Sequence, residues 1–402
     1  ALNLSFSPEN VRGGLYYFST SQRGLLRLPF GGTTAAPFIL GSGNPGQPTY
    51  CVGCHGVSRD GKKVAAVFGG GDGYAGIVQG NDPTKFLRAP AANGANRVWN
   101  FATFSPDGKR LITAWNGQLA LRDGDTGALI KTVDTNLVGG LASLPEWSPD
   151  GQSIAFVRVP PEGKIGSQLS PVGAIAAGDW LMTNAGDIAV LPYNNGAFAP
   201  AITVVPRASG SEYHFYPSFS PDSRWLVFNS ARVSECASDT AANNGATIPA
   251  GSCTSYDQTA ARLRLVAVGA NQAPIELSAA THLAASAAAW PKFTPFQQNN
   301  GRLVFFTFSA KFDYGFVVKQ SVIRQQTNAG RPQLWMAAID LQKAASGGGD
   351  PSYPPFWLPF QDSQNSNHEV LWTQDIACTV AADCGSETQF NCVQGVCVPK
   401  LG

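Results

Sequence analysis

The sequence predicts an all-β fold, a six-bladed β-propeller followed by a short disulfide-rich C-terminal extension. Turn-forming residues are abundant, with 44 Gly and 28 Pro among 402 residues. The apolar runs between them are strand-sized and rich in β-branched and aromatic residues, which favour strands. One hairpin phrase also recurs along the chain, and together these features predict many short strands joined by tight turns.

The recurring phrase consists of an apolar residue, a turn of the Ser-Pro-Asp-Gly type and an alternating apolar strand. Pro presets φ for such a turn, while Asp and Gly adopt its remaining geometry, so each phrase predicts a β-hairpin. Copies begin at six positions, namely Phe6, Val57, Phe104, Trp147, Phe219 and Phe293.

Further strands complete each repeat. After four of the hairpins comes a second pair of strand-like runs, for example 117–123 and 128–133. Four strands per repeat predict a propeller blade. The propeller is expected over 1–375, closed by a strand at 368–374, with 376–402 as the extension. The six blades are expected at 1–40, 48–90, 97–135, 140–206, 212–280 and 286–360.

The Ser-Pro-Asp-Gly repeat resembles the TolB-like (PD40-type) propeller repeat over most of the chain. A closer resemblance is to a group of secreted deltaproteobacterial proteins that combine an early Cys-x-x-Cys-His with a late Phe-Trp-Leu-Pro-Phe-Gln-Asp phrase. Here these elements are residues 51–55 and 355–372, and 309–315 and 333–340 also fit. This resemblance implies a secreted propeller with a c-type haem motif, and it pairs His368 with that motif.

The cysteines indicate an extracytoplasmic protein. Two of the eight belong to Cys-x-x-Cys-His, and the other six form an even set: Cys236, Cys253, Cys378, Cys384, Cys392 and Cys397. An even, clustered set predicts disulfides made in the periplasm, outside the cell or at its surface. A bridge is expected across the polar loop between Cys236 and Cys253, whereas the last four can pair in three ways. A secretory signal is expected to have been removed.

Cys51, Cys54 and His55 have the spacing that attaches one covalent haem c, with two thiols for the vinyl groups and an imidazole for the iron. The alternatives are a local disulfide, a redox Cys-x-x-Cys and half of a zinc site. Zinc would need a second ligand pair, and a thioredoxin-like motif would need a βαβ context.

The motif is predicted as a turn or short helix, because residues three apart in a strand point to opposite faces. Aligning the repeats places the haem on the loop entering the second blade, over one mouth of the central channel. In that alignment His55 is level with Ala102, Pro145, Pro217 and Pro291.

The second axial ligand is expected to be His368, with His214, His282 and Met182 as alternatives and an open position as the remaining choice. Met336 is expected to pack in the core. Ligation by two histidines would favour electron transfer at low potential, since both axial positions would be filled.

The leading functional hypothesis is an extracytoplasmic monohaem c-type cytochrome that exchanges electrons with other redox proteins or cytochromes, or self-assembles so that haems come close. One alternative is a peroxidase-type haem enzyme with an open distal site near Tyr213, His214 and Tyr216. The other is a protein-binding propeller with a structural or sensory haem.

Several other classes are not supported. The net charge is +1 and no basic run is present, which argues against nucleic-acid binding. No apolar run reaches the roughly 20 residues of a membrane-spanning helix. No serine lies in a nucleophile-elbow context, so hydrolase chemistry is not predicted.

Overall fold

The computed structural model describes most of the chain. The described residues are 13–41, 51–69, 73–90, 97–161, 182–183, 186–208, 211–236, 253–254, 261–281, 287–298, 301–314, 319 and 330–400.

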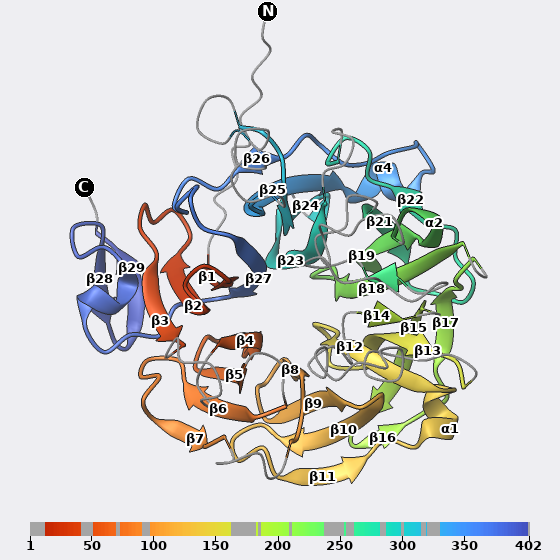
Figure 1. The fold of residues 1–402 in the computed structure, drawn as a ribbon, viewed down its shortest axis with the longest axis horizontal. Helices are drawn as coiled ribbons and strands as arrows, with labels where there is room; N and C mark the ends of the chain where they lie inside the picture. The colour runs from red at the N-terminus through yellow and green to blue at the C-terminus, as the bar shows by residue number, and fades with distance from the viewer. Residues whose placement is uncertain are drawn as a thin grey trace, which may run out of the picture.

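Six antiparallel sheets radiate around a central axis as the blades of a propeller, which confirms the predicted fold class (Figure 1). Blade 1 combines β27 with β1, β2 and β3, and blades 2 to 6 follow in chain order. The strands of blades 1 to 3 are β27 (Asn367–Thr373), β1 (Gly14–Ser19), β2 (Gly24–Pro29), β3 (Ala36–Leu40), β4 (Val52–Val57), β5 (Lys63–Phe68), β6 (Ala75–Gln79), β7 (Phe86–Arg88), β8 (Phe101–Phe104), β9 (Arg110–Trp115), β10 (Gln118–Asp123) and β11 (Leu129–Thr132).

The remaining strands form blades 4 to 6. Their strands are β12 (Leu141–Trp147), β13 (Ser153–Val159), β15 (Asp187–Asn194), β16 (Ala197–Phe198), β17 (Ile202–Val205), β18 (Glu212–Phe219), β19 (Trp225–Arg232), β21 (Arg262–Ala267), β22 (Ile275–Glu276), β23 (Ala289–Gln298), β24 (Leu303–Ala310), β25 (Gln333–Asp340) and β26 (Phe356–Trp357). A small sheet of β14 (Met182–Thr183) and β20 (Cys253–Thr254) joins the segments of blades 4 and 5. The short helices are α1 (Thr135–Val138), α2 (Val233–Cys236), α4 (Leu341–Ala345) and the 3₁₀ helix η5 (Ala381–Cys384).

The ring is closed by the two ends of the propeller within one sheet. β27 pairs antiparallel with β1, so that Gly14 faces Thr373 and Leu15 faces Trp372. The closing strand is the one predicted at 368–374. The six inner strands contact one another in the order β4, β8, β12, β18, β23, β27 and back to β4.

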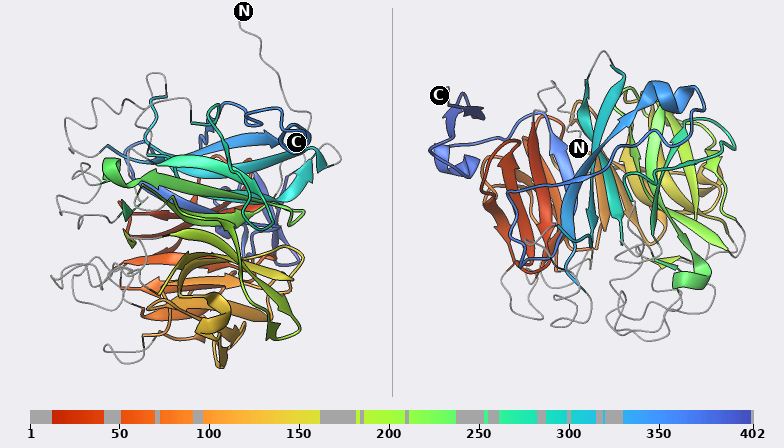
Figure 2. Two further views of the ribbon diagram at one scale, coloured as in Figure 1. Left: turned by 90° about the vertical axis from the view of Figure 1, so that its right-hand side faces the viewer. Right: turned by 90° about the horizontal axis from the view of Figure 1, so that it is seen from above.

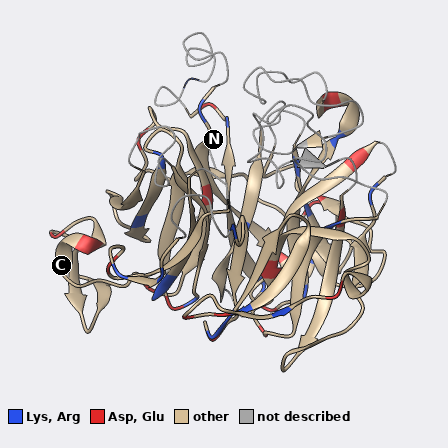
Figure 3. Cartoon of the chain, turned by 60° about the horizontal axis from the view of Figure 1, so that its bottom comes forward, with Lys and Arg blue, Asp and Glu red and all other residues tan. Residues whose placement is uncertain are grey.

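The Ser-Pro-Asp-Gly turns follow the inner strands and gather on one face of the disc, called here the hairpin face. The opposite face, where the inner strands begin, is called the entry face (Figure 2). In four turns the Ser hydroxyl donates to the Asp carboxylate two residues on, at 2.5 to 2.7 Å. Figure 3 shows Lys and Arg interspersed with Asp and Glu, in keeping with the small net charge.

The C-terminal extension packs against blade 1. It contains η5 and the hairpin of β28 (Phe390–Val393) and β29 (Val396–Pro399). The guanidinium of Arg27 is buried between the two parts, donates to the Ala377 carbonyl at 3.1 Å and lies 3.6 Å from Asp383. Among the described residues, no helix has the length and apolar character needed to cross a membrane.

Three disulfides cross-link the chain. Cys236 pairs with Cys253 as expected, and the pairing left open by the sequence is Cys378 with Cys392 and Cys384 with Cys397. The sulfur atoms of Cys378, Cys384 and Cys397 lie close together. Because all three are in disulfides, this cluster lacks the thiolates that a metal ion requires.

Candidate functional site

The Cys-x-x-Cys-His motif lies on the inner strand of blade 2. Cys51 immediately precedes β4, whereas Cys54 and His55 lie within it, so the prediction of a turn or short helix in an entry loop is wrong. A β-bulge explains the difference. The register with β5 shifts between Gly53 and Gly56, and Cys54 has φ +47° in the left-handed region. A bulge breaks strict side-chain alternation, which was the premise of the prediction.

The bulge is a feature of the repeat. Four other inner strands shift register at the same place, each with a non-glycine residue at positive φ. The inner strand of blade 3 pairs without such a shift. The five buried bulge residues, called here the bulge ring, are Cys54, Leu144, Tyr216, Trp290 and Glu369.

The bulge ring fills the middle of the channel with large side chains. The rings of Tyr216 and Trp290 stack with their centroids 3.9 Å apart. Cys54 and Leu144 belong to the same apolar cluster as this pair. Glu369 is the acidic member of the ring, and it comes from the closing strand β27.

His55 contacts the two inner strands of blade 1, β27 and β1. Its Nδ1 lies 3.5 Å from Glu369 Oε2, and its Nε2 lies 3.5 Å from the Tyr16 carbonyl oxygen. The imidazole is fully buried, and only 7% of the Glu369 side chain is exposed. A carboxylate near Nδ1 is the arrangement that orients a metal-ligating histidine, and Nε2 would bind a metal only in place of its contact with the Tyr16 carbonyl.

The two cysteines of the motif are both unpaired thiols, in contrast to the other six. Burial raises the pKa of Cys51 to about 11. The pKa of Cys54 is raised well above its usual value by burial, by the Glu369 carboxylate and by Cys51. Both side chains are therefore protonated at neutral pH. This argues against a reactive redox pair, which depends on a lowered thiol pKa.

His368 is buried on the strand that closes the ring beside this motif. It pairs with Phe18 of β1. Side chains of paired residues in antiparallel strands share one face of the sheet. A Cβ atom at Gly53 would lie only 3.3 Å from the Phe18 ring, so that face of blade 1 is turned toward blade 2. The structure thus places His368 on the side of blade 1 that faces blade 2 and its motif.

The alternative ligands are placed elsewhere or are not described. His214 lies on β18 of blade 5, across the ring from blade 2, with Nε2 3.3 Å from the Pro206 carbonyl and its ring edge-on to Phe228. Burial lowers the pKa of His214 to about 4. Met182 begins β14, beyond the blade 4 sheet. His282 lies outside the described residues, and Met336 is buried among apolar residues of blades 1 and 6.

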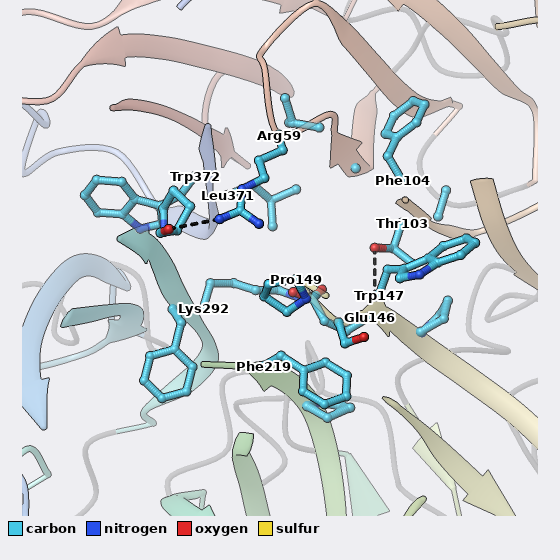
Figure 4. Close-up of a pocket in the computed structure, with 18 of the residues that line it drawn as sticks. Arg59, Thr103, Phe104, Glu146, Trp147, Pro149, Phe219, Lys292, Leu371 and Trp372 are labelled. Carbon is cyan, nitrogen blue, oxygen red and sulfur yellow. Dashed lines mark hydrogen bonds and ion pairs between the residues drawn. The ribbon is translucent and has the colours of Figure 1, made fainter. Parts of the chain in front are cut away.

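A cavity of about 150 Å³ occupies the channel between the bulge ring and the hairpin face (Figure 4). His55 and Glu369 border its inner end, and the turn prolines surround its mouth. Pockets for drug-sized ligands have volumes of roughly 300 to 1,000 Å³. A porphyrin is too large for this cavity. A haem attached to Cys51 and Cys54 would therefore have to lie outside it.

Sequence reasoning missed the most important partner of the motif, Glu369. Its only sequence signal is its position directly after His368 in the closing strand. The contact with His55 depends on ring closure and on a bulge, and neither is visible in a local pattern.

No family model and no curated protein matches the chain. Solved structures resemble it in fold. A putative TolB from Agrobacterium tumefaciens is 16% identical with a TM-score of 0.41, over 90% of this chain and 99% of that one. TolB from Acinetobacter baumannii is 14% identical with a TM-score of 0.46, over 90% and 66%. The fold is a TolB-like β-propeller.

Hydrazine synthase from Kuenenia stuttgartiensis is a further fold relative of this TolB-like propeller, 14% identical with a TM-score of 0.39 over 82% of this chain and 70% of that one. The three disulfides of the TolB-like chain are consistent with an extracytoplasmic location.

Proposed function

We propose that this chain is an extracytoplasmic monohaem c-type cytochrome that carries electrons. One observation supports this most strongly: of eight cysteines, the two left unpaired are those of the Cys-x-x-Cys-His motif, while six form disulfides. Cysteines of an extracytoplasmic protein usually form disulfides. Thioether attachment to a haem would explain why Cys51 and Cys54 do not.

The side chains fit a haem in their chemistry. Cys51 and Cys54 would attach it, His55 would ligate the iron through Nε2, and His368 would supply the second axial ligand. The group would contribute reversible one-electron redox chemistry. The channel cavity is too small for it, so the haem would lie outside that cavity.

The protein's own contribution would be to orient and shield the proximal histidine. Glu369 lies 3.5 Å from Nδ1 of His55, so a proton on Nδ1 would be stabilised there while Nε2 exchanged its contact with the Tyr16 carbonyl for the iron. The pair is buried, so water does not compete for the imidazole. A carboxylate partner also increases the basicity of the imidazole, which favours the oxidised form of a bound metal.

A single haem carries one electron, so this proposal requires partners. These would be other redox proteins or cytochromes, in the periplasm or at the cell surface, or further copies of this chain. The disulfides support such a location because they form and persist in oxidising compartments.

The test is a pyridine haemochrome spectrum together with intact mass on protein made in a host that matures c-type cytochromes. We expect one covalent haem per chain, lost in the Cys51→Ser, Cys54→Ser double variant. The matched control, Cys236→Ser with Cys253→Ser, removes a disulfide and should keep the haem. Wild-type protein without covalent haem would refute the proposal. A six-coordinate, low-spin signature that peroxide leaves unchanged would distinguish a carrier from a peroxidase.

A further inference from the structure

The channel mouth on the hairpin face is lined by the repeat turns of blades 2 to 6, and among these the turn of blade 2 departs from the others. In four blades the second residue of the turn is a proline that lines the cavity, namely Pro106, Pro149, Pro221 and Pro295. In blade 2 the same position is Arg59, which also lines the cavity. A cation therefore replaces a proline at this ring of turns.

The turn of blade 2 does not require this arginine. Ser58 Oγ donates to Asp60 Oδ1 at 2.7 Å, and the Lys62 amide donates to the same oxygen at 3.1 Å. The corresponding turn of blade 3, which contains a proline, makes the same two bonds through Asp107 at 2.6 and 3.0 Å. Asp60 is thus engaged as in the other repeats, and the turn is stabilised in the same way with either residue.

The other charged groups that line the cavity have partners. Lys292 Nζ lies 2.7 Å from Glu146 Oε2, and Glu369 lies 3.5 Å from His55. These contacts leave Arg59 as the unmatched charge at the cavity mouth, as far as the described residues go.

The side chain of Arg59 makes a single hydrogen bond with the described residues. Its Nη2 donates to the Pro295 carbonyl at 3.2 Å, and its Nε is buried without a hydrogen-bond partner. Burial lowers its pKa. Figure 4 shows the side chain reaching into the channel from blade 2, with Lys292 approaching from blade 6.

A half-buried guanidinium with an unused donor edge is suited to an oxyanion, because its planar donors match a carboxylate in a bidentate manner. The wall of the cavity also carries aromatic side chains, among them Phe219, Phe293 and Trp372. One water needs roughly 10 to 15 Å³ of such volume, so about 150 Å³ holds only a small molecule. These aromatic side chains favour a carboxylate with a short hydrocarbon tail over phosphate, which has no apolar part to contact them.

We propose that the hairpin-face mouth of the channel is a binding site for small aliphatic carboxylates, with Arg59 as the anchoring residue. The carboxylate pairs with the free edge of the guanidinium, and the hydrocarbon tail contacts the aromatic wall. This site lies at the opposite end of the cavity from His55 and does not depend on a haem.

The experiment is calorimetric titration of the full chain with butyrate, with butyramide as the neutral isostere and inorganic phosphate as the second anion. Arg59→Pro restores the repeat sequence, so it should fold and bind at least ten-fold more weakly. Arg59→Gln should weaken binding to a similar extent. Arg224→Gln is the matched control, since this arginine is also on the hairpin face but is 73% exposed and outside the cavity lining.

Saturable binding of butyrate near one per chain, absent for butyramide and lost in both Arg59 variants, is the expected result. Equal affinity in Arg59→Pro and wild type would overturn the assignment, as would the absence of saturable butyrate binding. Phosphate binding more tightly than butyrate would overturn the carboxylate class. Because the titration does not measure haem, these outcomes are independent of the spectra that test the cytochrome proposal.

Discussion

At the scale of single residues, Glu369 determines the surroundings of His55. It is a buried carboxylate at positive φ, a costly conformation for a residue other than glycine, and it faces Nδ1 of His55 at 3.5 Å. The acid is supplied by a strand more than 300 residues away in sequence, so the environment of His55 is complete only when the ring is closed.

Replacing Glu369 with Gln should raise the midpoint potential of the haem form, because the imidazole loses a negatively charged partner that increases its basicity. Spectroelectrochemical titration measures the shift. Glu276→Gln is the control, since that side chain is 48% exposed and distant from the motif. An unchanged potential with full haem content would show that the contact does not tune His55.

His214 provides a pH prediction. Its folded-state pKa of about 4 lies below the usual 6.5, mainly because of burial. Between these values the unfolded chain binds a proton that the native state does not, so stability is full above pH 6.5 and declines as the pH falls to 4. The full loss is about 3 kcal/mol. Urea unfolding at several pH values should show a flatter dependence for His214→Gln over this interval. Parallel wild-type and variant curves would contradict the assignment.

At the scale of elements, the loop restrained by Cys236 and Cys253 tests the role of the disulfides. The bridge spans 17 residues, and both half-cystines are fully buried. In the chain-entropy model its removal costs about 3 kcal/mol. Denaturant unfolding of the Cys236→Ser, Cys253→Ser variant should show this loss with an equal or slightly steeper slope, because the unfolded chain without the bridge exposes more surface. A loss below about 1 kcal/mol would mean that packing alone holds the ends of α2 and β20 together.

The strands and hairpins could be predicted from the sequence, whereas the β-bulges of the inner strands could not. Each Ser-Pro-Asp-Gly turn encodes its hairpin locally, which is why the strands around Phe104 and Trp147 were predicted correctly. The bulge at Cys54 carries no turn residue of its own, since the repeat places Cys, Leu, Tyr, Trp or Glu there. The main error about the motif, a turn in place of a bulged strand, follows from this.

At the scale of the whole molecule, closure is the step that makes six blades one cooperative unit. Trp372 of the closing strand donates Nε1 to Thr307 Oγ1 of blade 6 at 3.0 Å, and its ring lies 5.3 Å from Phe30 of blade 1. It therefore joins the last blade to the first through packing and a buried hydrogen bond. Each blade buries its faces only against its neighbours. A substitution at the contact between blades 1 and 6 should therefore lower the stability of all six blades together.

Trp372→Ala should destabilise the propeller by about 3 to 5 kcal/mol, the range for removing a large buried aromatic side chain. The unfolding transition, followed by far-ultraviolet circular dichroism in denaturant, should shift as a whole and remain single. Ile202→Ala is the control, since Ile202 is 37% exposed on the outer strand β17, away from the contact between blades 1 and 6, and surface changes of this kind stay within about 0.5 kcal/mol. A separate early transition in Trp372→Ala would mean that blade 1 opens alone, and that closure acts locally instead of on the ring.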